Sequence, residues 1–171
     1  MIGGGPVAER KTRVLLKCGA LVKVVSPELN PGLASLFRRK KVQWSARGYS
    51  DGCLRKAFLA VAATGERGVN HRASSYCRKN GILVNVVDVP QESDFIAPAF
   101  VEKNGLVIAV STSGLAPCLA RKIRRDLGAG FMQRYSGILK QLSRARKKLK
   151  ITCPEPSRRK SALNKLINSR I

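Results

Sequence analysis

Histidine, aromatic residues and acidic residues are all scarce in this chain of 171 residues. The single histidine, His71, argues against a histidine-rich metal site and against a Ser-His-Asp triad supported by a second histidine. Aromatic residues make up only 5% of the chain, and there is no aromatic RNA-binding motif, no zinc finger and no basic region running into leucine heptads. The usual motifs of nucleic-acid-binding proteins are therefore missing.

Closely spaced cysteines and long apolar runs are also missing. The five cysteines include no pair at the two-residue spacing of zinc or redox sites, so we expect them to be reduced and mostly packed. No segment approaches the roughly 20 consecutive apolar residues of a membrane span, and no long apolar segment follows basic residues at the N-terminus. We therefore expect a cytoplasmic protein without a membrane partner or a bound metal.

Basic residues greatly outnumber acidic residues in this chain. Lysine and arginine number 33 against 10 acidic residues, which gives a formal net charge of +23. Such a charge indicates a polyanionic partner, an anionic surface or a solvated basic face. The apolar content of 44% suffices for one good-sized domain and a smaller appendage.

Helical and β-branched segments alternate through the first half of the chain. Helices are expected over residues 7–16, 28–40 and 67–79, with Gly19 and Gly81 after the first and third. Buried strands are expected over residues 21–25, 42–44, 58–63 and 82–87. This alternation predicts an α/β fold with a parallel sheet.

After Pro90 the pattern changes to a hairpin followed by helices. Apolar runs at 95–101 and 106–111 flank a turn with Asn104-Gly105, which is a strong hairpin signal. Pro117 suits the first turn of a helix ending near Leu127. Basic helical segments are expected at 131–149 and 157–171, the second of which is a short helix or a frayed end.

Gly3 to Ala8 fits the G-x-G-x-x-A pattern of dinucleotide-binding loops. Gly3 makes the turn, Gly5 admits the pyrophosphate, and Ala8 lets helix and strand pack closely. Pro6 and Val7 begin the helix whose amides and dipole attract phosphate. A plain glycine-rich turn is the alternative, but the helix and strand that follow favour cofactor binding.

The segment Ser26-Pro27-Glu28 ends the second strand, where such folds often hold the adenosine ribose. Glu28 or Ser26 is suited to accept the ribose hydroxyls. No arginine follows immediately to bind a 2′-phosphate, which favours NAD over NADP. Glu28 would otherwise be a favourable acidic residue in the first turn of the next helix.

A series of motifs runs in order from Gly3 to about Leu127. It comprises Gly-Gly-Gly-Pro-Val-Ala-Glu-Arg-Lys, Val-Val-Ser-Pro-Glu-Leu, Ala-Ala-Thr at 62–64, Val69-Asn70, Asn85-Val86-Val87-Asp88, Phe95-Ile96-Ala97-Pro98-Ala99 and Leu119-Ala120-Arg121. The series resembles the precorrin-2 dehydrogenase and sirohydrochlorin ferrochelatase family, the N-terminal region of siroheme synthases. The segment from Asn85 to Arg121 is its most specific part.

The resemblance implies an enzyme that oxidises precorrin-2 to sirohydrochlorin with NAD, and in some members also inserts ferrous iron. It implies an NAD-binding Rossmann domain over residues 1–97, a dimerisation and active-site region over 98–128, and a basic helical segment over 129–171. It also implies a homodimer formed through the region after Pro98. Because precorrin-2 bears eight carboxylates, this substrate accounts for part of the positive charge without a specific nucleic acid.

Within this resemblance Asp88 is the catalytic acid/base, since ligands of open α/β sheets bind beyond the carboxyl ends of the strands. The resemblance also implies that Ala63 and Thr64 contact the cofactor and that Asn85 contacts the substrate. Further substrate-binding candidates are Ser111, Thr112, Ser113, Arg121 and Arg124. The alternatives are structural: Asp88 would cap a turn or a helix, residues 111–113 would form an ordinary turn, and Arg121 and Arg124 would be solvated.

The N-terminus departs from the family. Only Met1 and Ile2 precede Gly3, where relatives have a β-branched strand of several residues. We expect so short a stub to leave its neighbouring strands without hydrogen-bond partners, and the natural protein to begin upstream of Met1. Two other functions stay open, a catalytically silent tetrapyrrole or NAD sensor and a basic nucleic-acid-binding protein.

Overall fold

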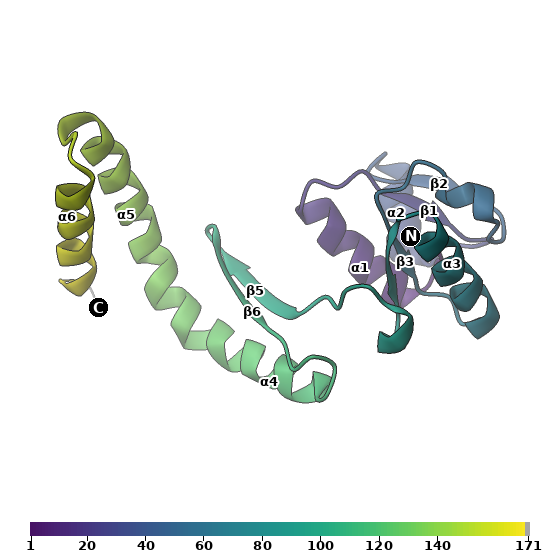
Figure 1. Cartoon of the computed structure of the whole chain (residues 1–171). Coiled ribbons are helices and arrows are strands. Elements are labelled where there is room, and N and C mark those ends of the chain that lie inside the picture. Colours follow the sequence, from purple (N-terminus) through teal and green to yellow (C-terminus); the bar gives the residue numbers. More distant parts are fainter. Residues whose placement is uncertain (170–171) are drawn as a thin grey trace. The chain divides into compact units, whose positions relative to one another are not determined.

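A parallel β-sheet forms the core of the N-terminal part of the chain. The computed structural model describes residues 1–169 (Figure 1), so the last two residues of the predicted C-terminal segment lie outside the described part. The chain divides into a first compact unit, Met1–Ile96, and a second unit that begins at Ala97.

Two parallel strand pairs are joined into one sheet by a single residue of the N-terminal stub. β1 (Lys23–Val25) pairs with β2 (Gln43–Ser45), and β3 (Leu59–Ala62) pairs with β4 (Leu83–Val86). Ile2 bridges Val25 on one side and Ala62 on the other. The spatial order is therefore β2, β1, Ile2, β3, β4, which confirms the predicted α/β class with a parallel sheet.

The expectation that the stub would leave its neighbouring strands without hydrogen-bond partners is wrong for the residues beside Ile2. Ile2 donates to Val61 O at 2.8 Å and accepts from Ala63 N at 2.8 Å, while Gly3 N donates to Val25 O at 2.9 Å. The Ile2 side chain is 1% exposed. The stub is enough because Ile2 bonds to the β3 side, while its neighbours Met1 and Gly3 bond to Val25 of β1.

Helices cover both faces of this sheet. α1 (Pro6–Lys17) and α2 (Pro31–Arg38) bury Ala8, Leu33 and Leu36 against one face. α3 (Arg67–Lys79) buries Ala73 and Cys77 against the other face. Short 3₁₀ turns, η1 (Asp51–Leu54) and η2 (Pro90–Glu92), lie beside β3 and β4. The helices that follow one another along the chain cover one face of the sheet on the β1 side of Ile2 and the other face on the β3 side. The carboxyl end of the stub is therefore the switch point of the sheet, where ligands of such folds bind.

The second unit is a hairpin packed on helices (Figure 1). β5 (Ala99–Lys103) and β6 (Leu106–Val110) are antiparallel, and Asn104 and Gly105 both have positive φ, as the Asn-Gly signal predicts. α4 (Pro117–Asp126) leads through the π-turn η3 (Leu127–Phe131) into α5 (Met132–Thr152), and α6 (Pro156–Asn168) follows.

The expected helix start at Glu28 is wrong, whereas α4 ends at Asp126, close to the expected Leu127. Asp126, Leu127 and Met132 keep right-handed helical dihedrals, so the backbone passes from α4 to α5 through a π-turn instead of breaking. α2 begins at Pro31 because Asn30 caps it by accepting from Leu33 N at 3.0 Å. Glu28 therefore lies in the loop before α2, outside its first turn.

The cysteines are free but mostly not packed. Cys53 and Cys77 are buried, whereas Cys18 and Cys118 are exposed and Cys153 is half-buried. Burial raises the pKa of the Cys77 thiol to about 11. Over residues 1–169 no helix combines the length and apolar character of a membrane span, and no group of three or more metal-ligating side chains occurs.

The α-amino group of Met1 makes the stability of the first unit dependent on pH. It donates to Lys23 O at 2.8 Å, and burial lowers its pKa from 8.0 to about 6. The unfolded chain therefore binds a proton between pH 8 and 6 that the folded chain does not. We expect the free energy of unfolding to fall by about 2 kcal/mol from pH 8 to pH 6.

Urea unfolding followed by the fluorescence of Trp44, the only tryptophan, measures this change within the first unit. An N-terminally acetylated chain is the control, because it has no α-amino group to titrate. The same decline in the acetylated chain would assign the pH dependence to other groups.

Candidate functional site

The glycine loop sits at the switch point, and its first two glycines are required by close backbone packing. Gly3 has φ +111°, and a Cβ there would lie 2.4 Å from Ala63 O. A Cβ on Gly4 would lie 1.9 Å from Glu28 O and 2.6 Å from Ser26 Oγ. These contacts bring the loops after β1 and β3 against the glycine loop.

Gly5 differs because a Cβ built on it meets nothing within 4 Å. Gly5 is the N-cap of α1, and no side chain caps the amides of that helix. Open space in front of uncapped helix amides is the arrangement that binds phosphate. The fully buried Ala8 one turn later lets α1 pack on the sheet. These residues fit the pyrophosphate of a dinucleotide.

The N-terminal ends of α1 and α2 are tied together by Glu9. Its carboxylate accepts from Asn30 Nδ2 at 2.6 Å and from Arg13 Nε at 2.7 Å. These hydrogen bonds, with the Asn30 amide first, lower the pKa of Glu9. Gly32 leaves the room for this group, since a Cβ there would lie 2.0 Å from the Glu9 carboxylate. The tie fixes the loop that carries Glu28.

The loop after β1 presents one exposed carboxylate beside the glycine loop. Ser26 is buried, and its hydroxyl donates to Glu28 O at 2.6 Å, while Trp44 Nε1 donates to Ser26 O at 3.0 Å. The side chain of Glu28 is exposed and has no hydrogen-bond or ion-pair partner among residues 1–169. Between the two candidates for the ribose, Glu28 is the one with free oxygens, and Ser26 shapes the loop.

The loop after β3 is held by Asn70. Its side-chain oxygen accepts from Thr64 N at 3.2 Å and lies 2.8 Å from Thr64 Oγ1, and its amide donates to Thr64 O at 3.1 Å. Asn70 is buried in α3. The Thr64 hydroxyl is therefore engaged within the loop, and Ala63 and Thr64 face the site chiefly through their backbone.

At the end of β4, Asn85 and Asp88 have different environments. Asn85 is buried, donates to Phe95 O at 2.9 Å and accepts from Lys11 Nζ at 2.7 Å. Asp88 is exposed, has φ +60°, and has no hydrogen-bond or ion-pair partner in the described part of the chain. A left-handed backbone at an exposed carboxylate beyond a strand end is a feature that often accompanies function.

Lys11, the last residue of the first motif, is a site residue to which the sequence analysis assigned no role. It projects from α1 to Asn85, and partial burial and the neighbouring Arg10 lower its pKa, whereas Asp88 opposes this shift. Lys11 thus places an ammonium group near the carboxylate of Asp88. The sequence alone does not indicate a contact with Asn85, because lysines on helices are usually solvated.

The remaining predicted site residues lie in the second unit. Thr112 Oγ1 accepts from Ala116 N at 3.1 Å and Ser111 Oγ accepts from Ser113 N at 3.1 Å, so the ordinary turn is present. Arg121 is exposed on α4. The Nε of Arg124 is buried without a hydrogen-bond partner among the described residues.

The chain is similar to several known proteins. Residues 1–99 match the family described as "Putative NAD(P)-binding". Siroheme synthase 3 of Aeromonas hydrophila subsp. hydrophila is 40% identical over 152 residues, covering 85% of this chain and 32% of the relative. Siroheme synthase of Pseudomonas entomophila is 38% identical over 160 residues, covering 94% of this chain and 35% of the relative.

The chain thus spans about a third of the length of these curated relatives. A solved structure, "SirC, precorrin-2 dehydrogenase", superposes with a TM-score of 0.83 at 25% identity and covers 97% of this chain and 82% of that chain. The fold is therefore shared over both units.

Proposed function

Because the chain belongs to the precorrin-2 dehydrogenase and siroheme synthase family of NAD(P)-binding proteins, we propose that it oxidises precorrin-2 to sirohydrochlorin with NAD. This reaction is a step of siroheme biosynthesis. The single observation that supports it best is the pairing of an open, uncapped phosphate loop at Gly5 with the exposed Asp88 at the end of β4.

Different residues of the first unit bind the cofactor and position the proton acceptor. Gly3 and Gly4 pack the loop, and Gly5 and the first-turn amides of α1 hold the pyrophosphate. Glu28 accepts hydrogen bonds from the adenosine ribose. NAD, when bound, supplies a hydride acceptor. Asn85 and Lys11 fix the end of β4 so that Asp88 can reach the substrate.

The oxidation removes a hydride and a proton from the macrocycle. Asp88 takes the proton at a carboxylate oxygen, which requires a group that is exposed to the substrate and not already bound. Its lack of a partner meets that requirement. The hydroxyls at 111–113 and the guanidinium groups of Arg121 and Arg124 stay candidates for binding carboxylates of the substrate.

NADH absorbance measured after precorrin-2 and NAD are added together tests this proposal. We expect NADH to appear only when both are present. A catalytically silent sensor would bind both ligands in calorimetry without forming NADH. Ferrous iron insertion is a second candidate activity, because the same exposed carboxylate can accept pyrrole protons. Loss of sirohydrochlorin fluorescence on adding ferrous iron measures it.

We propose a cytoplasmic homodimer formed through the region after Pro98. Apolar side chains of this region are exposed within the second unit, with Val107 58%, Leu115 90% and Leu119 50% exposed. Large apolar side chains left exposed are often covered by another protein chain where they lie close together. We expect a dimer in sedimentation at micromolar concentration and a monomer after Leu115→Asp and Leu119→Asp. A monomeric wild type would refute the proposal.

A further inference from the structure

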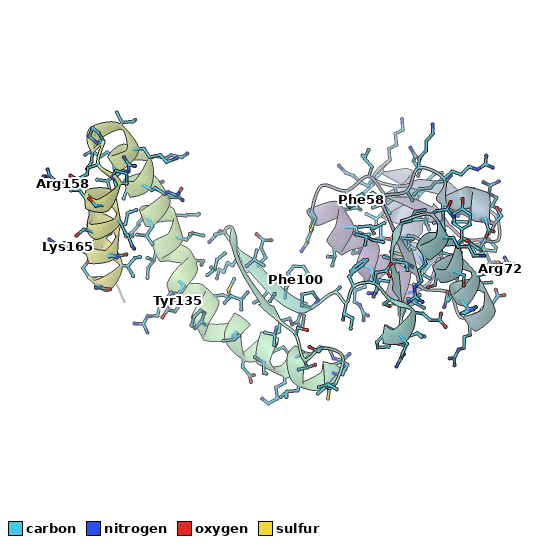
Figure 2. All side chains as sticks on the ribbon, in the orientation of Figure 1. Phe58, Arg72, Phe100, Tyr135, Arg158 and Lys165 are labelled. Atoms are coloured by element: carbon cyan, nitrogen blue, oxygen red, sulfur yellow. The ribbon has the colours of Figure 1, made fainter. Side chains whose placement is uncertain are left out.

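The helices α5 and α6 carry far more positive charge than one substrate requires. Residues 132–169 contain eleven lysines and arginines and one acid, Glu155. Glu155 pairs with Arg158 at 2.7 Å. Arg158 and Lys165 lie on the side of α6 turned away from α5 (Figure 2). The facing sides of the two helices are therefore left without an acidic residue.

A groove of about 420 Å³ runs between α5 and α6. Arg146 and Lys150 line it from α5, and Arg159, Lys160 and Asn164 from α6, above a floor of leucine and isoleucine side chains. We call it the α5–α6 groove. Its lining contains no acid and no aromatic residue.

The cations of the groove are mostly unpaired. Arg159 donates to Cys153 O at 2.8 Å and to Pro154 O at 2.6 Å, which holds the turn between the helices. Arg146, Lys150 and Lys160 are exposed and have no ion-pair or hydrogen-bond partner within residues 1–169. Arg146 and Lys150 are four residues apart on one helix, a spacing at which like charges repel. A bound anion would relieve that repulsion.

The charge does not end at the groove. Arg144, Lys147 and Lys148 lie on the same turns of α5 but do not line the groove, so they surround it with further positive charge. A small polycarboxylate would be confined to the groove, whereas an extended polyanion would make its contacts in the groove and also be attracted over a distance by the charge around it. Arginine, lysine and asparagine are side chains that contact phosphate oxygens.

We propose that the α5–α6 groove binds the phosphodiester backbone of nucleic acid without sequence preference. Backbone contact suits the groove because it offers no aromatic ring on which bases could stack. The proposal concerns a function apart from the dehydrogenase and does not depend on it. DNA and RNA share the chemistry that is recognised, and the test separates them.

The test measures binding of the full chain to a labelled 20-base-pair DNA duplex and to an RNA duplex of the same sequence, over a series of salt concentrations. The groove variant carries Arg146→Gln, Lys150→Gln and Lys160→Gln. The matched control carries Arg144→Gln, Lys147→Gln and Lys148→Gln, which removes the same charge outside the groove. Glutamine favours helices, and circular dichroism checks that both variants fold.

We expect the groove variant to lose at least tenfold in affinity at 100 mM salt, and its salt slope to become less negative by about 0.9 for each lost phosphate contact on DNA. The control should lose less than about threefold. Equal losses in the two variants would overturn the proposal, because they would show general attraction by charge. So would tighter binding to phosphatidylserine vesicles, or full displacement of the duplex by equimolar benzenehexacarboxylate.

Turnover of precorrin-2 by the same variants is a separate measurement. We expect it to be unchanged, since none of the substituted residues lies in the proposed active site. A failure of the nucleic-acid proposal and a failure of the dehydrogenase proposal are therefore distinguishable.

Discussion

The Asp88→Asn protein is expected to bind NAD and precorrin-2 as the wild type does but to turn over about 10²- to 10⁴-fold more slowly. Asparagine keeps the size of the side chain and tolerates the left-handed backbone that Asp88 adopts at φ +60°. What it removes is the oxygen that accepts the proton. Steady-state kinetics with NADH absorbance as the signal give the ratio of kcat values.

Asp88→Ala tests two roles of the residue together, as the proton acceptor and as a residue that tolerates the left-handed backbone of the turn after β4. Alanine removes the carboxylate and also disfavours the positive φ, so we expect the same kinetic loss with a lower melting temperature. If Asp88→Asn retained more than a tenth of wild-type kcat, Asp88 would not be the proton acceptor. In that case Asp88 would serve to shape the turn after β4.

Gly5→Ala is expected to lower the affinity for NAD at least tenfold without changing the stability of the first unit. Gly5 has φ −85°, which alanine adopts freely, and the added methyl group contacts nothing within 4 Å in the protein. The methyl group would instead fill the space reserved for the pyrophosphate. Calorimetry measures the affinity, and urea unfolding followed by Trp44 fluorescence measures the stability.

Gly4→Ala is the matched control, since it adds the same methyl group one residue earlier. Its Cβ would lie 1.9 Å from a backbone oxygen, Glu28 O, so the loop must shift. We expect a loss of about 1–3 kcal/mol in the free energy of unfolding. Wild-type affinity for NAD in Gly5→Ala would show that the pyrophosphate does not approach this loop.

The sequence predicted those elements whose signals are local. α3 runs from Arg67 to Lys79 as expected, and the hairpin turns at Asn104-Gly105, because helix-ending residues and Asn-Gly turns act through their own backbone preferences. The glycine loop was predicted for the same reason. The required small size of Gly4, by contrast, comes from its packing on Glu28, which is distant in sequence.

What the sequence did not predict depends on long-range contacts. Ile2 pairs with two strands that follow it by 23 and 60 residues, as its bridges to Val25 and Ala62 show, so a two-residue stub can occupy the middle of a sheet. Lys11 gains its position only when α1 lies against the end of β4. The π-turn joining α4 to α5 likewise overrides the local tendency of Gly128 and Gly130 to end a helix.

The proposed reaction transfers a hydride from precorrin-2 to NAD held at the glycine loop. The most direct measurement follows NADH and sirohydrochlorin in parallel, without oxygen, in one reaction that contains the purified chain, NAD and precorrin-2. We expect one NADH for each sirohydrochlorin, and no sirohydrochlorin above the uncatalysed rate when NAD is left out. Sirohydrochlorin formed at the same rate without NAD, or both ligands bound with no NADH formed, would contradict it.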